Sequence, residues 1–354
     1  MIRKIIFICV ALICKQDTLA SVVMGSRPDF KDDADEVRVR LEIIPSGQKT
    51  GYGEIDPSGY EEFLTRISRM KQLRSLSVSF VRVPNAGFVF PIERLTGLTN
   101  LNCLAIFNHG TNPAKVTSIA LCKAMPLKEL DLRYVEVGGE DSVRDFKRLE
   151  SLSCSSGDLF RFAPSGLRSL AIENAEVKGE LELSRFYQLE TLQLINVKCS
   201  SIQGLSSLNC LESLFIYGIP VGNLSEIKSC ARLKSLVIND CMNFDDKFDI
   251  ANLKSLPLKD VEIRNCPLSR IQGLEKCPLE NLWIDGTGIQ SLNDICSLPK
   301  LKFLDVASDK IHLKGFEDIE HVKELFPNLE RMTLKYYDSV DKEIKIEDID
   351  LQGN

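Results

Sequence analysis

The chain has 354 residues, of which 44% are hydrophobic and 27% charged, and its formal net charge is −6. This composition can build a hydrophobic core and excludes a disordered protein. The negative charge, together with lysines and arginines that are scattered along the chain, argues against nucleic acid or an anionic membrane as the main partner.

The first twenty residues have the pattern of a secretory signal peptide. The positive segment MIRK precedes the apolar run IIFICVALIC, and KQDTLA ends in small residues at Thr18 and Ala20. This apolar run is too short to cross a bilayer. We therefore expect residues 1–20 to be a signal peptide and the mature protein to be secreted, periplasmic or at the cell surface, without membrane insertion. The alternative is a cytoplasmic protein in which this run is not a signal.

Two predicted elements follow, which we assign to an N-terminal cap over residues 21–72. VRVRLEII (37–44) alternates apolar and polar residues as a strand does. SGYEEFLTRISRM (58–70) begins with Ser58 and Glu61 at capping-box spacing. Its apolar residues lie on one helical face and are Tyr60, Phe63, Leu64, Ile67 and Met70.

The remainder of the chain is built on a repeat of the form L-x-x-L-x-L. LETLQL, LESLFI, LKSLVI and LENLWI are clear examples, and five of the steps between copies are 22 residues long. The twelve copies begin at Leu73, Leu101, Leu127, Leu149, Leu167, Leu189, Leu211, Leu233, Leu258, Leu279, Leu301 and Leu329. Self-similarity at this period predicts a solenoid of stacked units.

The segments between the strands also repeat. SSIQGLSSLNC (201–211) and SRIQGLEKCPL (269–279) place apolar residues at three-residue intervals, which suits an extended or 3₁₀ turn on the outer side. KEIKIEDIDL (342–351) alternates again as a strand. We assign the solenoid to residues 73–337 and a C-terminal cap strand and tail to residues 338–354.

Over about residues 70–337 the chain resembles leucine-rich repeat proteins, in particular the 22-residue class of the internalin-like bacterial proteins and their phosphatase-regulating cytosolic relatives. The resemblance implies an α/β solenoid: a horseshoe with a parallel β-sheet on the concave face, 3₁₀ or short helical turns on the convex face, and caps at both ends. It implies a binding role without naming the ligand.

Two features depart from that family. Its asparagine, eight residues after the first leucine, is replaced by Val197, Ile219, Cys241, Cys266 and Thr287. We expect the ladder of asparagine hydrogen bonds to be mostly absent and packing to replace it. The repeat from Leu149 is short and rich in Gly and Ser, which predicts a kink or defect in the curve.

Ten cysteines follow residue 20, and most occupy core positions of the repeat, where cysteine behaves as a small hydrophobe. Cys154 replaces the third leucine of its strand, and Cys230 and Cys277 replace the last core leucine of theirs. We interpret them as buried thiols; at least one disulfide is the alternative in an exported chain.

The sequence gives little sign of catalysis. His312 and His321 flank an acidic stretch, but their spacing matches no zinc pattern and the segment has helical periodicity, so we interpret it as a solvated helix. No phosphate loop or nucleophile elbow is present. We expect a non-catalytic protein with no metal site and no cofactor.

The residues that flank the third leucine of each strand face the concave side, because side chains alternate along a strand. In the C-terminal half these positions become apolar and aromatic, with charges around them. We predict that this surface binds a protein or peptide; the alternative is that the side chains only stabilise neighbouring strands. The predicted ligand-binding residues are Ile195, Phe215, Tyr217, Val237, Glu262, Arg264, Trp283, Asp285 and Asp305.

The functional prediction is therefore an exported leucine-rich repeat protein that binds a protein or peptide through its concave face. An intracellular scaffold or adaptor of the phosphatase-regulator kind is the alternative.

Overall fold

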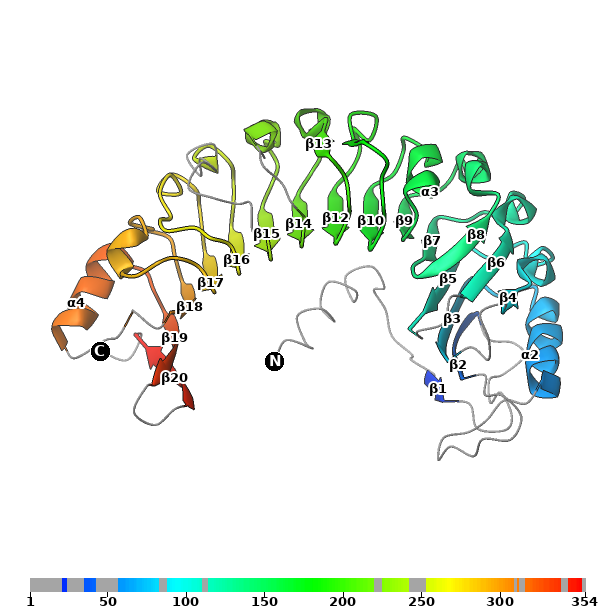
Figure 1. Cartoon of the computed structure of the whole chain (residues 1–354), viewed down its shortest axis with the longest axis horizontal. Coiled ribbons are helices and arrows are strands. Elements are labelled where there is room, and N and C mark those ends of the chain that lie inside the picture. Colours follow the sequence, from blue (N-terminus) through cyan, green and yellow to red (C-terminus); the bar gives the residue numbers. More distant parts are fainter. Residues whose placement is uncertain are drawn as a thin grey trace.

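The computed structural model shows an arc in which the strands line the inner, concave side and turns and short helices form the outer, convex side (Figure 1). It describes residues 21–23, 35–42, 57–82, 88–109, 114–219, 225–241, 253–308, 311, 316–338 and 343–351. The predicted signal segment lies outside these ranges. Among the described residues, no helix is both long and apolar enough to span a membrane.

A single 15-stranded sheet forms the concave face. Its strands, in spatial order, are β1 (Ser21–Val23), β2 (Glu36–Glu42), β3 (Ser75–Arg82), β5 (Cys103–Asn108), β7 (Glu129–Leu132), β9 (Ser151–Cys154), β10 (Ser169–Glu173), β12 (Thr191–Ile195), β14 (Ser213–Tyr217), β15 (Ser235–Asn239), β16 (Asp260–Arg264), β17 (Asn281–Asp285), β18 (Phe303–Ala307), β19 (Arg331–Asp338) and β20 (Glu343–Asp350). Each of the twelve predicted repeats supplies one strand, and the order follows the sequence. The predicted leucine-rich repeat horseshoe is confirmed.

Alternation of side chains explains why the repeat forms this sheet. In β14, Leu214 and Ile216 point into the core and are 0% and 1% exposed, whereas Ser213, Phe215 and Tyr217 face the other side. β12, β15, β17 and β18 have the same alternation of buried and partly exposed residues. Because every repeat presents leucines at equivalent positions, stacking the repeats produces one continuous core.

The convex side is built from short segments. The 3₁₀ helices are η1 (Ile92–Leu95), η2 (Ile119–Cys122), η3 (Glu140–Asp145), η4 (Leu205–Ser207), η5 (Ser225–Ser229) and η7 (Leu292–Asp294). Short strands β4 (Val89–Phe90), β6 (Ala114–Ser118) and β8 (Val135–Gly138) form one small sheet, and β11 (Glu180–Glu182) and β13 (Ser201–Gln203) form another. The predicted extended or 3₁₀ segment over 201–211 is confirmed by β13 and η4.

The helix predicted over 58–70 corresponds to α2 (Pro57–Arg69), which lies at the N-terminal end of the arc (Figure 1). Phe63, Leu64 and Ile67 are at most 1% exposed and join the solenoid core. At the other end, α4 (Phe316–Leu325) precedes β19, and β20 pairs with β19 in the antiparallel sense. Of the two histidines near α4, His321 lies 2.9 Å from Asn293 Oδ1, and His312 lies outside the described residues.

The short repeat that begins at Leu149 does not interrupt the sheet. β9 pairs with β7 and β10 in unbroken register, with Leu152 between Leu130 and Leu170. The predicted defect is wrong for the sheet, because the difference is confined to the convex side. There the six-residue helix α3 (Gly157–Phe162), capped by the Ser156 side chain, connects the two strands.

In five consecutive repeats the position where the family has asparagine is filled by small buried side chains, whereas Thr287 in the next repeat is half-buried. Ala175, Val197 and Ile219 are at most 2% exposed, and Cys241 and Cys266 are 0% exposed. These groups pack in the core between successive repeats. Packing therefore takes the place of polar contacts at this position.

A few amide contacts lie one residue earlier in the repeat, at a position that the sequence pattern did not single out. Asn196 Nδ2 donates to Asn174 Oδ1 over 3.1 Å, and Asn265 Nδ2 donates to Asp240 Oδ1 over 2.8 Å. These residues have φ between 50° and 55°, a left-handed conformation that Asn and Asp tolerate better than most residues. Gly218 holds the same position with φ 62°, and a Cβ there would lie 2.2 Å from Asn196 Oδ1.

None of the ten described cysteines forms a disulfide. Cys154, Cys230 and Cys277 are at most 4% exposed, so their interpretation as core residues is confirmed. Burial raises the pKa of Cys154 to about 12 and that of Cys230 to about 11. The buried-thiol interpretation does not extend to all ten, since Cys103, Cys199, Cys210 and Cys296 are half-buried.

Candidate ligand-binding face

The nine predicted ligand-binding residues lie on six adjacent strands of the concave sheet, from β12 to β18. Strand register places them in two columns that run across the sheet. The first column is Gln193, Phe215, Val237, Glu262, Trp283 and Asp305. The second is Ile195, Tyr217, Asn239, Arg264, Asp285 and Ala307. Unbroken parallel pairing therefore brings together residues that are up to 110 positions apart in the chain, from Ile195 to Asp305.

The apolar patch consists of Ile195, Phe215, Tyr217 and Val237. Tyr217 is 41% exposed, and the other three are half-buried between their strand neighbours. Tyr217 contacts Asp240, and this hydrogen bond, with some burial, raises the pKa of the phenol. The patch thus consists of one exposed aromatic ring, that of Tyr217, next to three half-buried apolar side chains.

Trp283 lies further along the first column and is also half-buried. Its ring packs on Phe303, with the centroids 5.6 Å apart and the ring planes at 48°. Phe303 begins β18, two residues before Asp305, and both face the concave side. This pair extends the apolar surface beyond the strand that carries Glu262.

The charged residues that separate the two apolar regions contact one another. Glu262 is 8% exposed, accepts a hydrogen bond from Asn239 Nδ2 over 2.9 Å, and lies 3.1 Å from Arg264 Nε. That distance is typical of an ion pair, but the Nε–H is not aligned for a hydrogen bond. Asn239 Oδ1 is buried and has no hydrogen-bond partner among the described residues. Glu262 therefore faces the concave side but is covered by its neighbours.

Asp305 is paired with Lys335, whose Nζ donates to both carboxylate oxygens over 2.8 and 2.6 Å. Asp285 is half-buried next to Arg264 in the second column. The acidic residues among the predicted ligand-binding positions are thus partly neutralised by Arg264 and Lys335. What the surface offers a ligand is chiefly its aromatic and aliphatic groups.

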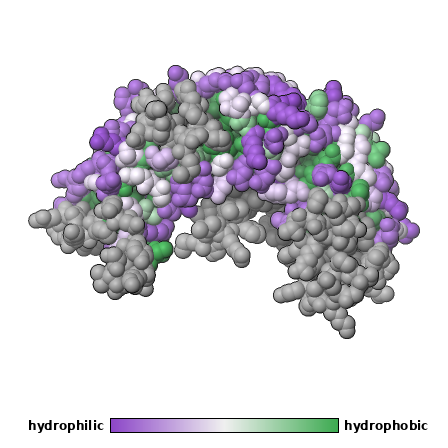
Figure 2. Space-filling model, viewed as in Figure 1, coloured by the Kyte–Doolittle hydropathy of each residue, from purple (hydrophilic) through white to green (hydrophobic). Residues whose placement is uncertain are grey.

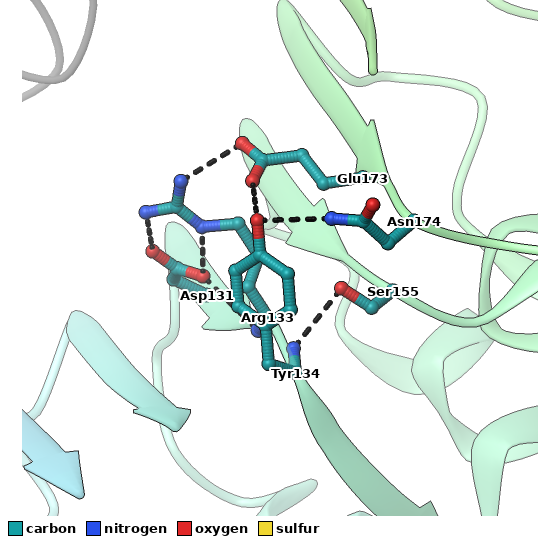
Figure 3. A network of polar contacts seen from close by, with 6 residues as sticks. All are labelled: Asp131, Arg133, Tyr134, Ser155, Glu173 and Asn174. Carbon is teal, nitrogen blue, oxygen red and sulfur yellow. Dashed lines mark hydrogen bonds and ion pairs between the residues drawn. The ribbon is translucent and has the colours of Figure 1, made fainter. Parts of the chain in front are cut away.

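A second cluster on the concave face was not singled out from the sequence. We call it the charged network; its members are Asp131, Arg133, Tyr134, Ser155, Glu173 and Asn174 (Figure 3). Arg133 donates to Asp131 over 2.9 and 2.7 Å, and its third bond, of 2.9 Å, reaches Glu173. Because Glu173 is on β10, the guanidinium spans β9, where the concave residues are serines.

Tyr134 closes the charged network on one side. Its hydroxyl donates to Glu173 over 2.8 Å and accepts from Asn174 Nδ2 over 3.1 Å, while its backbone N–H donates to the Ser155 hydroxyl. Burial, followed by the charge of Glu173 and the hydrogen bond to it, raises the pKa of Tyr134 to about 12. Tyr134 has φ 61°, which is uncommon for a bulky residue.

The ion-paired side chains of this network are largely removed from solvent, at 17% exposure for Arg133, 21% for Asp131 and 8% for Glu173. Burial by itself disfavours the guanidinium charge, but the hydrogen bonds and charges of Asp131 and Glu173 raise the pKa of Arg133 overall. Burial also raises the pKa of Asp131, although its bonds with Arg133 oppose the effect. The arrangement is a satisfied ion cluster with little capacity left for a ligand.

Outside the concave face the surface is mostly polar. In the view of Figure 2 hydrophilic residues cover most of the coloured part of the arc, and hydrophobic ones form small separate areas. Tyr187, 53% exposed, is one of the large apolar residues that are exposed away from the concave strands.

The repeat pattern and the architecture together define the chain as a leucine-rich repeat protein. It is 25% identical over 265 residues to horse Toll-like receptor 4, an alignment that covers 70% of this chain and 29% of the receptor. The chain thus spans less than a third of the length of that curated relative. No family model matches the sequence.

Solved structures that are similar to this chain include an internalin and a leucine-rich repeat protein. An internalin from Listeria monocytogenes has 17% sequence identity and a TM-score of 0.44, with 86% of this chain and 80% of that chain covered. A leucine-rich repeat protein from Leptospira interrogans has 15% identity and a TM-score of 0.44, with 75% and 91% covered.

Proposed function

We propose that this protein is a non-catalytic binding module whose concave face, from β12 to β18, binds a protein or peptide. The observation that carries the proposal is the apolar patch: four bulky side chains on three consecutive in-register strands, with Tyr217 41% exposed at its centre. Exposed aromatic groups on a rigid sheet are typical of the residues that dominate protein interfaces.

The pairing of the neighbouring charges supports the same proposal. Glu262 is paired with Arg264, and Asp305 is paired with Lys335. A ligand therefore does not need to neutralise these charges in order to bind. The cost of removing water from these groups on binding is correspondingly low. An extended or helical segment with apolar side chains is the class of ligand that fits this surface.

Trp283 allows a direct test, because it is the single tryptophan of the chain and lies on the proposed face. Candidate ligands recovered by affinity capture are titrated into the protein while tryptophan emission is recorded. We expect a saturable change in emission. Tyr217→Ala is expected to weaken binding about tenfold or more, because such anchors contribute 2 kcal/mol or more at interfaces.

The matched control is Tyr187→Ala, which removes an equally large and more exposed tyrosine from a turn outside the concave columns. It should leave affinity within twofold. Equal affinity for the two variants, with both folded by circular dichroism, would contradict the proposal that the apolar patch binds the ligand.

We further propose that the protein is exported, on the basis of the pattern of residues 1–20. The similarity to a protein named as a receptor is compatible with a role in binding outside the cell. Intact mass of the protein from each compartment of its host is the test. A product that lacks residues 1–20 in the exported fraction is expected; a full-length cytoplasmic product would favour the intracellular adaptor instead.

A further inference from the structure

A basic pocket lies on the convex side of the short repeat, away from the concave face. Its cavity volume is about 530 Å³, and the cations that line it are Arg144, Lys147, Arg161 and Arg185. Phe162 and the turn that follows it form the remaining wall. η3, α3 and the turn before β12 therefore contribute to one hollow, although they belong to different repeats.

Main-chain carbonyls hold the four cations in place. Arg144 Nε donates to Asp141 O over 2.7 Å, and Lys147 Nζ donates to Arg144 O over 2.9 Å. Arg161 donates to Lys178 O over 2.7 Å, and Arg185 donates to Phe160 O over 2.5 Å. Because carbonyl oxygens carry no net charge, these bonds fix the side chains without cancelling their charge.

Aromatic rings provide most of the remaining contacts. The Arg185 guanidinium lies 4.5 Å from the Phe186 ring centroid and 5.7 Å from that of Phe160, and burial lowers its pKa. Arg144 lies 4.9 Å from the Phe162 centroid. Cation–π contacts of this kind stabilise a guanidinium while leaving its N–H groups able to bind an anion.

No carboxylate is among the residues of the described chain that line the pocket. Asp141, which is 3.2 Å from Arg144, forms the one ion pair that the described residues make with these four cations. Lys147, Arg161 and Arg185 are thus left with uncancelled charge in a chain whose net charge is −6. Some cations elsewhere on the surface are paired instead, as Lys128 is with Glu150 over 3.0 Å.

We propose that this pocket binds a small ligand that carries phosphate or sulfate groups. Arginine forks match the geometry of such oxyanions, and lysine adds a mobile donor. A volume of about 530 Å³ is in the range of small-molecule sites and exceeds what a single phosphate fills, so the ligand carries more than one anionic group or an apolar part against Phe162. The negative charge of the whole chain disfavours a long polyanion in this role.

The test uses isothermal titration calorimetry of the folded protein with inorganic phosphate, pyrophosphate, tripolyphosphate and inorganic sulfate, all at one ionic strength set with sodium chloride. We expect saturable binding that tightens from phosphate to tripolyphosphate, because each added group meets a further cation. Comparison of phosphate with sulfate identifies which oxyanion the pocket prefers.

Lys147→Gln with Arg161→Gln should weaken tripolyphosphate binding at least about tenfold, since each charge-assisted hydrogen bond is worth more than a factor of ten. The matched control, Arg232→Gln with Arg270→Gln, removes the same charge from exposed positions in other repeats and should change affinity less than twofold. The absence of saturable binding by any of the four anions would overturn the proposal. Equal weakening in both double variants would also overturn it, because net charge alone would then explain the effect. Thermal melting establishes that both double variants are folded. If Lys147→Gln with Arg161→Gln does not fold, the single variant Arg161→Lys is used in its place.

Discussion

The two halves of the concave face are built from the same strand repeat and are filled in different ways. Between β7 and β10, Arg133 crosses a strand of serines to join Asp131 and Glu173, and Ser153 beneath is only 6% exposed. Between β12 and β15, the same positions hold Phe215, Tyr217 and Val237. The first region satisfies its polar groups internally, whereas the second leaves apolar area exposed.

This difference shows that the size of the side chains on one strand decides which contacts the side chains of the neighbouring strands can make. Small residues on β9 leave room for a guanidinium to bridge two strands that are not adjacent. Where each strand carries a large residue, as on β14 and β15, the side chains pack against their direct neighbours and project outward. A surface for binding and a surface for stability thus arise from one scaffold.

The largest expected effect comes from removing the cation at the centre of the charged network. Arg133→Ala leaves Asp131 and Glu173 buried without their partner, and we expect a loss of about 3 kcal/mol in the free energy of unfolding. Lys335→Ala, in the C-terminal half, breaks a more exposed pair and should cost about 1 kcal/mol or less. Urea denaturation followed by circular dichroism measures both.

A control separates lost pairing from lost packing. Replacing the three charges together, by Asp131→Asn, Arg133→Met and Glu173→Gln, removes the ions and keeps most of the volume. We expect this triple variant to be more stable than Arg133→Ala, because no buried charge is left unpaired. Equal losses in the free energy of unfolding for Arg133→Ala and Lys335→Ala would contradict the view that the ion cluster of the N-terminal half contributes more to stability than the ion pair of the C-terminal half.

A smaller effect is expected on the pKa values of two tyrosines, Tyr134 and Tyr217, which are almost equally exposed, at 40% and 41%. Burial is the main cause of the raised pKa of Tyr134, about 12, whereas the hydrogen bond with Asp240 is the main cause for Tyr217. We therefore expect Asp240→Asn to bring the pKa of Tyr217 back toward the ordinary value. Glu173→Gln should leave the pKa of Tyr134 raised.

Tyrosinate absorbance during an alkaline titration measures these values, with Tyr134→Phe and Tyr217→Phe to assign each step. Since folding raises the pKa of Tyr134, its contribution to stability is fully present below the unfolded pKa of about 10. That contribution is lost as the pH rises through about 12. A Tyr217 step that does not move in Asp240→Asn would contradict the assigned cause.

Much of this protein follows from its sequence. Twelve copies of L-x-x-L-x-L predict the strands, their order and their core residues, because stacked repeats bury the same positions in the same way. The columns that hold Phe215, Tyr217 and Trp283 also follow, since parallel strands in register align equivalent residues. The position of the apolar patch on the concave sheet therefore follows from the sequence.

Other features depend on contacts that no local pattern specifies. Arg133 and Glu173 are 40 residues apart and meet because β9 between them carries small side chains. The sequence showed the spacing of Asp131 near the end of β7 and Arg133 just after it, but this signal was insufficient. The contact between Asn174 and Asn196 was not expected, because these amides lie in a left-handed turn one residue before the position that the family pattern indicates.

The basic pocket was also decided by tertiary structure alone. Its four cations come from three segments that are separate in the sequence, and the packing of α3 against η3 and the next turn gathers them. The sequence by itself determined the repeat, the sheet and the columns, because these depend on a periodic pattern of burial. The tertiary structure decided which charges are paired and which remain available, because pairing depends on distances between repeats.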